Sequence, residues 1–196
     1  MEKKILEIKD YINIEDNALP YETLSSFLQW LNTLDTFHEA TIWNEGEVKL
    51  KKHIRDVQSF CLPTQHQSKT LVHWHRVLIN LFRKALRSYE QKYCLGCFHV
   101  NNFRNIDILK YYEGNHFTVH SDSAPKEPRT ISIIYLLNND YEGGELVFTT
   151  PDTKEDYLTI ENKPNRLVVF PSNFLYPHKV KPVTKGVRYS VVSWVI

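Results

Sequence analysis

The second half of the chain consists of short runs of strand-forming residues. From residue 98 onward, glycines and prolines separate runs rich in Ile, Val, Tyr and Phe, a pattern typical of strands joined by turns. The stretch NNDYEGG at 138–144 indicates one such turn. The expected strands lie at 98–102, 106–113, 116–121, 131–137, 145–149, 157–160, 166–170, 178–181 and 187–195. Short strands at regular spacing predict a sandwich or jelly roll.

The first half of the chain carries helical patterns instead. Pro20 stands where proline is tolerated, at the start of a helix, and apolar residues follow at helical spacing at positions 24, 27, 28, 31 and 34. A clearer helix is expected over residues 69–92, and residues 4–14 are interpreted as a strand. The expected fold class is α+β, with N-terminal supporting helices packed on the β-sandwich.

Two stretches of the first half leave alternatives open. Residues 40–68 lack a clear period, and so long a connection is usually functional or disordered. They form either a mobile flap near an active site or a solvated surface loop. Cys94 and Cys97 form a C-x-x-C motif without a second pair, so small buried thiols in a turn are favoured over a zinc or redox site.

Length, net charge and cysteine content indicate the number of domains, the expected partners and the cellular compartment. A chain of 196 residues is expected to form one domain, and its formal net charge of +1 favours neither nucleic acid nor an anionic membrane. The first residues contain no long apolar run, and no run approaches the roughly 20 residues that span a bilayer. Three cysteines, an odd number, fit a reduced compartment. We therefore expect a cytoplasmic protein.

The polar residues of the β-rich half form a candidate metal site. Side chains two apart on a strand share a face, so His120 and Asp122 project together if their segment is extended. The best third ligand is His178, far downstream. Two histidines and one carboxylate form the facial triad of non-haem Fe(II) oxygenases. The alternative is that His178 is a surface histidine following a proline.

Arg188 follows His178 by ten residues, in the last expected strand. Arg188 and Trp194 share a strand face with Ser190 and Val192. An arginine on an inward face needs a partner, because a lone buried charge is costly. A dicarboxylate ligand would supply that partner to the bidentate guanidinium. The alternative is that Arg188 is an ordinary surface charge.

Several separate motifs resemble one enzyme family. The segment YYEGNHFTVHSD at 111–122 resembles the Y-x-x-G-x-x-[FY]-x-x-H-x-D pattern of prolyl 4-hydroxylase-type 2-oxoglutarate/Fe(II) dioxygenases. Residues 129–137 resemble the family strand that begins with arginine, and GGELVF at 143–148 resembles its G-G-E-T-x-F. Pro177-His178 with 186–194 resembles its closing H…G-x-[KR]…W. The resemblance covers about residues 98–196.

The resemblance implies a fold and a role for each matching residue. Residues 98–196 would form the catalytic core, a double-stranded β-helix (jelly roll), with residues 1–97 as helical support and flap region. His120, Asp122 and His178 would bind Fe(II). Arg188 and Tyr111 would hold the distal carboxylate of 2-oxoglutarate. The positions that line the substrate side in this family are matched here by Arg129 and Trp194.

The implied activity is that of a 2-oxoglutarate-dependent oxygenase (EC 1.14.11.-) that consumes O2 and releases succinate and CO2 while it hydroxylates a substrate C–H bond. A peptidyl proline is the expected substrate, and ascorbate is a further cofactor that the resemblance allows. The alternatives are a free amino acid or another protein side chain as substrate, or a catalytically silent β-sandwich that acts as a binding module. No nucleic-acid or membrane partner is expected.

The chain also departs from the family pattern. The family strand T-x-L-x-Y-L becomes SIIYLL at 132–137, which places the tyrosine one position early. Tyr135 is therefore expected to face away from the site, with Leu136 in the usual place of the tyrosine. G-G-E-T becomes GGEL at 143–146, and arginine replaces the lysine of collagen-type members at position 188. These departures concern the identity of the substrate rather than the binding of iron or 2-oxoglutarate.

Overall fold

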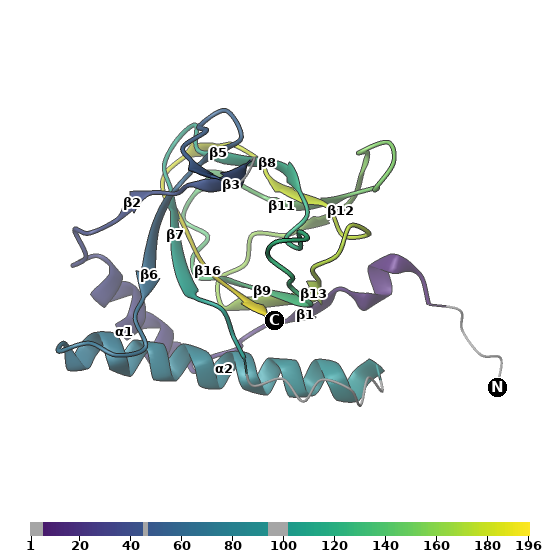
Figure 1. Ribbon diagram of the computed structural model, residues 1–196. Coiled ribbons are helices and arrows are strands. Elements are labelled where there is room, and N and C mark those ends of the chain that lie inside the picture. Colours follow the sequence, from purple (N-terminus) through teal and green to yellow (C-terminus); the bar gives the residue numbers. More distant parts are fainter. Residues whose placement is uncertain (1–5, 45–46, 94–101) are drawn as a thin grey trace.

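The computed structural model describes residues 6–44, 47–93 and 102–196. Its core is a pair of antiparallel β-sheets stacked face to face, the arrangement of a jelly roll (Figure 1). The larger sheet has seven strands, in the order β1 (Asn13–Glu15), β13 (Arg166–Pro171), β9 (Ile131–Leu136), β16 (Arg188–Val195), β7 (Ile106–Tyr111), β6 (Gln58–Leu62) and β2 (His38–Glu39).

The second sheet carries the strands that approach the candidate metal site. It has five strands, in the order β12 (Asp156–Ile160), β11 (Leu146–Thr149), β14 (His178–Val180), β8 (His116–His120) and β5 (Arg55–Asp56). Two short pairs complete the described strands: β10 (Glu142–Gly143) with β15 (Val183–Lys185), and β3 (Ile42–Asn44) with β4 (Glu47–Lys49).

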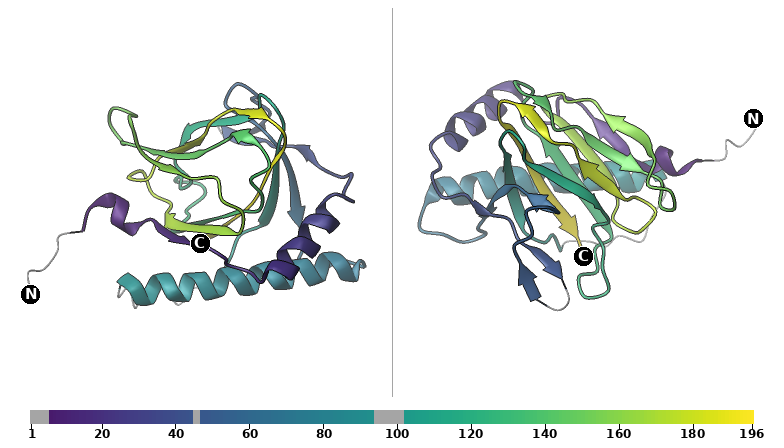
Figure 2. Two further views of the ribbon diagram at one scale, coloured as in Figure 1. Left: turned by 180° about the vertical axis from the view of Figure 1, so that it is seen from behind. Right: turned by 90° about the horizontal axis from the view of Figure 1, so that it is seen from above.

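Helices cover the outer face of the larger sheet. A single turn of 3-10 helix at Ile8–Tyr11 precedes β1, and the α-helices of the described chain are α1 (Tyr21–Leu31) and α2 (Lys69–Tyr93). Figure 2 shows α2 lying across the larger sheet, on the side opposite the second sheet. No helix among the described residues is long and apolar enough to span a bilayer.

Both faces of the larger sheet are buried, and its side chains alternate between two cores. Toward the helices, Ile133 and Tyr135 of β9 pack in one apolar cluster with Phe27 of α1 and Phe82 of α2. Toward the second sheet, Leu136 of β9 packs in a separate cluster. This alternation is the period-2 geometry of a strand. It confirms that Tyr135 faces away from the site, where its hydroxyl donates to Asn165 Oδ1 at 2.7 Å, and that Leu136 faces the site.

Most expected elements are present, with differences at the N-terminal end. Of the stretch 4–14, residues 8–11 form 3-10 helix and the strand begins only at Asn13. Residues 40–68 are not structureless, because they contain β3, β4, β5 and β6, and β6 lies inside the larger sheet. Cys94, Cys97 and nearly all of the expected strand 98–102 lie outside the described residues.

Candidate metal and cosubstrate site

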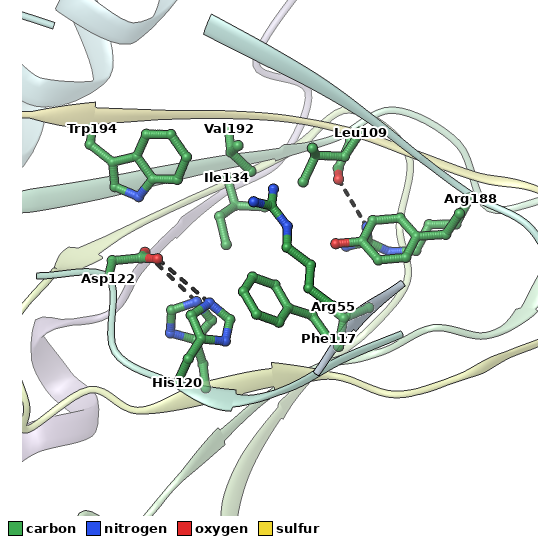
Figure 3. A pocket seen from close by; sticks show the side chains of 13 residues that line it. Arg55, Leu109, Phe117, His120, Asp122, Ile134, Arg188, Val192 and Trp194 are labelled. Carbon is green, nitrogen blue, oxygen red and sulfur yellow. Dashed lines mark hydrogen bonds and ion pairs between the residues drawn. The ribbon is translucent and has the colours of Figure 1, made fainter. Parts of the chain in front are cut away.

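The predicted metal ligands meet in a pocket between the two sheets (Figure 3). His120 ends β8, and Asp122 lies two residues beyond it. His178 begins β14 and stands opposite His120 in the antiparallel register. Two segments separated by nearly sixty residues in the sequence are therefore brought together by one pair of strands.

The three side chains are close enough to share one cation. Asp122 Oδ1 lies 3.6 Å from His120 Nε2, and Asp122 Oδ2 lies 3.7 Å from His178 Nε2. One ligand atom from each residue can be chosen so that all three lie within 4.8 Å of one another. Two imidazoles and a carboxylate suit a non-haem Fe(II) ion and leave coordination positions open.

Hydrogen bonds orient both imidazoles with Nε2 toward this centre. His120 Nδ1 lies 2.8 Å from the Thr118 carbonyl oxygen, and His178 Nδ1 lies 3.1 Å from the Tyr176 carbonyl oxygen. Because a carbonyl oxygen only accepts, Nδ1 is the donor in each contact, and in a neutral imidazole this leaves Nε2 as the atom with a free lone pair. A backbone acceptor behind a histidine ligand is a common feature of protein metal sites.

The protonation states of the triad also suit a bound cation. Burial alone would raise the pKa of Asp122, but the two histidines and the Ser132 hydroxyl together hold that pKa below its usual range. The Ser132 Oγ donates to Asp122 Oδ2 at 2.6 Å. Burial, followed by His120, lowers the pKa of His178 to about 4. An ionised carboxylate beside a neutral imidazole is the protonation state that binds a metal.

Arg188 and Tyr111 lie side by side in the same pocket. They are paired in register on β16 and β7, and the Arg188 Cζ is 4.9 Å from the centre of the Tyr111 ring. Arg188 is 1% exposed. Its Nη1 donates to Ser190 Oγ at 2.9 Å, while its Nε is buried without a hydrogen-bond partner. Burial raises the pKa of Tyr111, so its hydroxyl is neutral and available as a donor.

Gly144 fixes the space that Arg188 occupies. Its φ is +66°, and a Cβ built on it would lie 3.0 Å from Arg188 Cδ and 3.0 Å from Val183 Cγ2. The glycine is therefore required both by the left-handed backbone and by the close approach of the arginine stem. The G-G motif of the sequence thus supports the pocket without contributing a side chain to it.

The structure also brings Arg129 and Trp194 together. The Arg129 Cζ lies 3.9 Å from the centre of the Trp194 ring. The same guanidinium donates to the Asp122 carbonyl oxygen at 3.3 Å and to Glu127 Oε2 at 2.8 Å. Trp194 lines the pocket directly, whereas Arg129 stands behind it and next to the backbone of Asp122.

Three residues of the site were given no role from the sequence, although Phe117 occupies the [FY] position of the motif at 111–122. Ser132 orients Asp122, and its signal was a serine within an otherwise apolar strand. Phe117 stacks on His120, with ring centres 3.6 Å apart and planes at 15°. Arg55 lines the pocket from β5. Its segment gave no strand signal, so its position could not be inferred before β5 was seen to pair with β8.

Comparison with known proteins finds sequence similarity over the β-rich half of the chain. Residues 106–196 match the model of the 2OG-Fe(II) oxygenase superfamily. Over 74 residues, 35% of the chain, it is 42% identical to prolyl 3-hydroxylase 2 of Homo sapiens, of which it covers 10%. It is 32% identical over 98 residues, or 48% of its length, to a PKHD-type hydroxylase of Parvibaculum lavamentivorans, of which it covers 42%. The chain thus spans less than half the length of these relatives.

Solved structures share the fold over almost the whole chain. A prolyl hydroxylase of Trichoplax adhaerens, in complex with a peptide fragment of the hypoxia inducible factor oxygen degradation domain, superposes with a TM-score of 0.73 at 19% identity, over 94% of this chain and 83% of its own. A prolyl 4-hydroxylase of Pseudomonas putida gives a TM-score of 0.69 at 20% identity, over 93% and 91%. Residues 106–196 are thus similar in sequence to the 2OG-Fe(II) oxygenase superfamily, as the motifs of that region predicted, and the fold shared with these solved structures extends over almost the whole chain.

Proposed function

We propose that this chain is an Fe(II)- and 2-oxoglutarate-dependent hydroxylase whose substrate is a prolyl residue of a peptide. The observation that carries the proposal is the convergence of His120, Asp122 and His178 within 4.8 Å, in one pocket with the buried Arg188. A metal triad alone would fit several chemistries. A triad that faces a buried arginine fits a metal-bound keto acid with a second carboxylate.

Arg188 and Tyr111 account for the cosubstrate. A buried guanidinium is costly unless an anion offsets its charge, and Arg188 has a hydroxyl, Ser190 Oγ, as its side-chain partner. The distal carboxylate of 2-oxoglutarate would supply the negative charge, and the neutral Tyr111 hydroxyl would donate to the same group. Both residues therefore position the cosubstrate and do not enter the chemistry.

Each part of the pocket then has a task. Bound Fe(II) supplies the redox chemistry that couples O2 and 2-oxoglutarate to substrate hydroxylation. His120, Asp122 and His178 hold the ion on one side, so that the remaining positions face the pocket. Ser132 orients Asp122 and, after the two histidines, helps to keep it ionised. Trp194 lines the pocket near Arg129, where it would contact the substrate.

The proline substrate is supported by the names of the relatives. Both the prolyl 3-hydroxylases and the structural neighbours, which are named as prolyl hydroxylases, act on proline, and one neighbour was solved with a peptide. The relatives divide between the 3- and 4-positions of the ring, so the position of hydroxylation is left to experiment. A free amino acid or another side chain is the second candidate, and the binding module is the candidate without activity.

The test is turnover of 2-oxoglutarate by the purified chain with Fe(II), O2 and ascorbate. We expect succinate to form, and a proline-containing peptide to gain one oxygen atom in the mass spectrum. His178→Ala should abolish both products, whereas His38→Ala, an exposed histidine of β2, should abolish neither. Succinate without peptide oxidation would exclude the peptides tested, and absence of succinate from folded, iron-loaded protein would leave the binding module.

A further inference from the structure

The pocket contains a second arginine that the proposed chemistry does not use. Arg55 belongs to β5, which pairs with β8, and Arg55 stands opposite Phe117 in the register. Its Cζ lies 5.0 Å from the centre of the Phe117 ring, and that ring stacks on His120. In Figure 3 the Phe117 ring lies between the His120 imidazole and the Arg55 side chain, which extends into the pocket. Arg55 is therefore one aromatic ring away from the metal triad.

The charge of Arg55 is poorly compensated. Its hydrogen bond runs from Nη1 to the Thr41 carbonyl oxygen at 3.0 Å, and its Nε is buried without a partner. Among the described residues, no carboxylate forms an ion pair with it. Asp107 is close enough for Arg55 to stabilise its ionised form, yet burial is the larger effect and raises the pKa of that carboxyl.

Two other arginines lie in the same region, and each has an assigned anionic partner that Arg55 lacks. Arg129 and Arg188 also have a buried Nε without a partner. The charge of Arg129 is matched by Glu127 at 2.8 Å, and that of Arg188 is assigned above to the distal carboxylate of 2-oxoglutarate. The other carboxylate of that diacid would bind the metal. Both acidic groups of the cosubstrate are then accounted for, and the Arg55 guanidinium has no assigned anion.

We propose that Arg55 binds a carboxylate of the primary substrate and makes the enzyme selective for acidic substrates. The inference rests on the proposed function, since it requires 2-oxoglutarate to occupy Arg188. The guanidinium has planar donors that suit a carboxylate. It lies over the Phe117 ring, whose other contact is with His120 of the metal triad. The carboxylate comes either from an Asp or Glu side chain adjacent to the target residue or from the α-carboxylate of a free amino acid.

The experiment compares matched acid and amide probes. The first pair consists of two peptides with blocked termini. In one, Asp precedes and follows the proline, and in the other, Asn takes both places. The second pair is L-proline against L-prolinamide. Binding of each probe to the full chain loaded with Fe(II) and 2-oxoglutarate is measured anaerobically by calorimetry, so that affinity is read without turnover. Tighter binding of the Asp peptide than of the Asn peptide would identify a peptide side chain as the source of the carboxylate. Tighter binding of L-proline than of L-prolinamide would identify a free amino acid.

The wild-type protein should bind the acid of one pair about tenfold more tightly than the amide, the effect of one charge-assisted hydrogen-bonded contact. In Arg55→Gln this preference should fall to about one, whereas Arg55→Lys, which keeps the charge, should retain part of it. Arg87→Gln removes an equal charge from the exposed face of α2 and should leave the preference unchanged. Urea unfolding of each variant establishes that it is folded.

Three outcomes would overturn the proposal. The first is equal binding of acid and amide in every pair by the wild-type protein, and the second is a preference that survives in Arg55→Gln. The third is a loss of 2-oxoglutarate affinity in Arg55→Gln with the acid preference intact, which would assign Arg55 to the cosubstrate. Failure of the proposed function is distinguishable from all three, because the wild-type protein would then form no succinate from 2-oxoglutarate.

Discussion

The two faces of the larger sheet are both buried, but they are built from different residues. Toward α1 and α2, the sheet presents Ile, Leu, Val and Tyr side chains that pack into one apolar cluster. Toward the second sheet, the same strands present apolar residues and, among them, buried polar ones such as Arg188, Ser132 and Ser190. Both sides therefore bury apolar residues, and the pocket-facing side in addition holds the polar residues of the candidate site.

Strand β16 shows the contrast within eight residues. Val191 and Val195 pack with the helices, whereas Arg188 and Trp194, on the alternate face, line the pocket. Because side chains alternate along a strand, one strand serves both sides at once. A shift of one residue in its register would bury the arginine among the helices and place valine in the site. The four predictions below test whether a substitution on one side of the sheet leaves the property assigned to the other side unchanged, either the free energy of unfolding or the binding of Fe(II) and 2-oxoglutarate.

The largest effect is expected on the helix-facing side. Phe82 of α2 is fully buried in the apolar cluster, and Phe82→Ala should lower the free energy of unfolding by about 3–5 kcal/mol, through lost transfer free energy and the cavity left behind. Urea unfolding measures this change. The affinity of the remaining folded protein for Fe(II) should stay unchanged, and a large loss of that affinity would show that the two sides are not separable.

The metal triad should respond in the opposite way. Asp122→Asn removes the one negative ligand while it keeps the shape of the side chain, and we expect Fe(II) affinity to fall by about a hundredfold or more, beyond the 10- to 100-fold effects of residues that only support a ligand. Anaerobic titration with Fe(II) measures the loss. Glu145→Gln removes a carboxylate that lies outside the triad and serves as the control. Equal affinities in the two variants would contradict the assignment of Asp122.

Ser132 tests the support behind the triad. Its hydroxyl donates to Asp122 Oδ2 at 2.6 Å and is also 2.7 Å from Ser172 Oγ. Ser132→Ala removes a hydrogen bond to a buried carboxylate, so Fe(II) affinity should fall by about tenfold. Ser193 belongs to the neighbouring strand β16 and is paired with Ile133, which faces the helices. Ser193→Ala should therefore leave Fe(II) affinity unchanged. A Ser132→Ala protein that bound Fe(II) as tightly as wild type would exclude a role for this hydroxyl.

The smallest effect is expected from a residue without a side chain. In Gly144→Ala the new methyl group would meet the Arg188 Cδ at 3.0 Å, so the arginine must shift from the position that faces the pocket. We expect the KM for 2-oxoglutarate to rise by about three- to tenfold, roughly 1 kcal/mol, with little change in Fe(II) affinity. Gly114→Ala is the control, because its φ is also positive but no atom lies near the added Cβ.

The sequence predicted the β-rich half well and the first half in part. The strands from β7 onward alternate apolar residues between two buried faces and are separated by Gly and Pro, so their local pattern agrees with the fold. Two of the strands within residues 40–68 were missed because they depend on distant partners: β6 on β7, and β5 on β8. Strand propensity is weak where pairing and burial decide the structure.

The same distinction explains the candidate site. The metal-ligand candidates and Arg188 were predictable, because their spacing forms a motif and each residue type is costly to bury without a purpose. Arg55 was not predictable from its own segment. It reaches the pocket only because β5 joins the sheet beside Phe117, which is a property of the tertiary fold and leaves no pattern in the sequence.

The most direct test of the central claim is anaerobic addition of Fe(II) and then 2-oxoglutarate to the purified protein, followed by visible absorption. If the pocket-facing side binds both, the weak charge-transfer band of the metal–keto acid complex should appear, decay on admission of O2, and be absent in His178→Ala. Folded wild-type protein that binds Fe(II) without developing the band would show that the triad and Arg188 do not form one site, and would contradict the account.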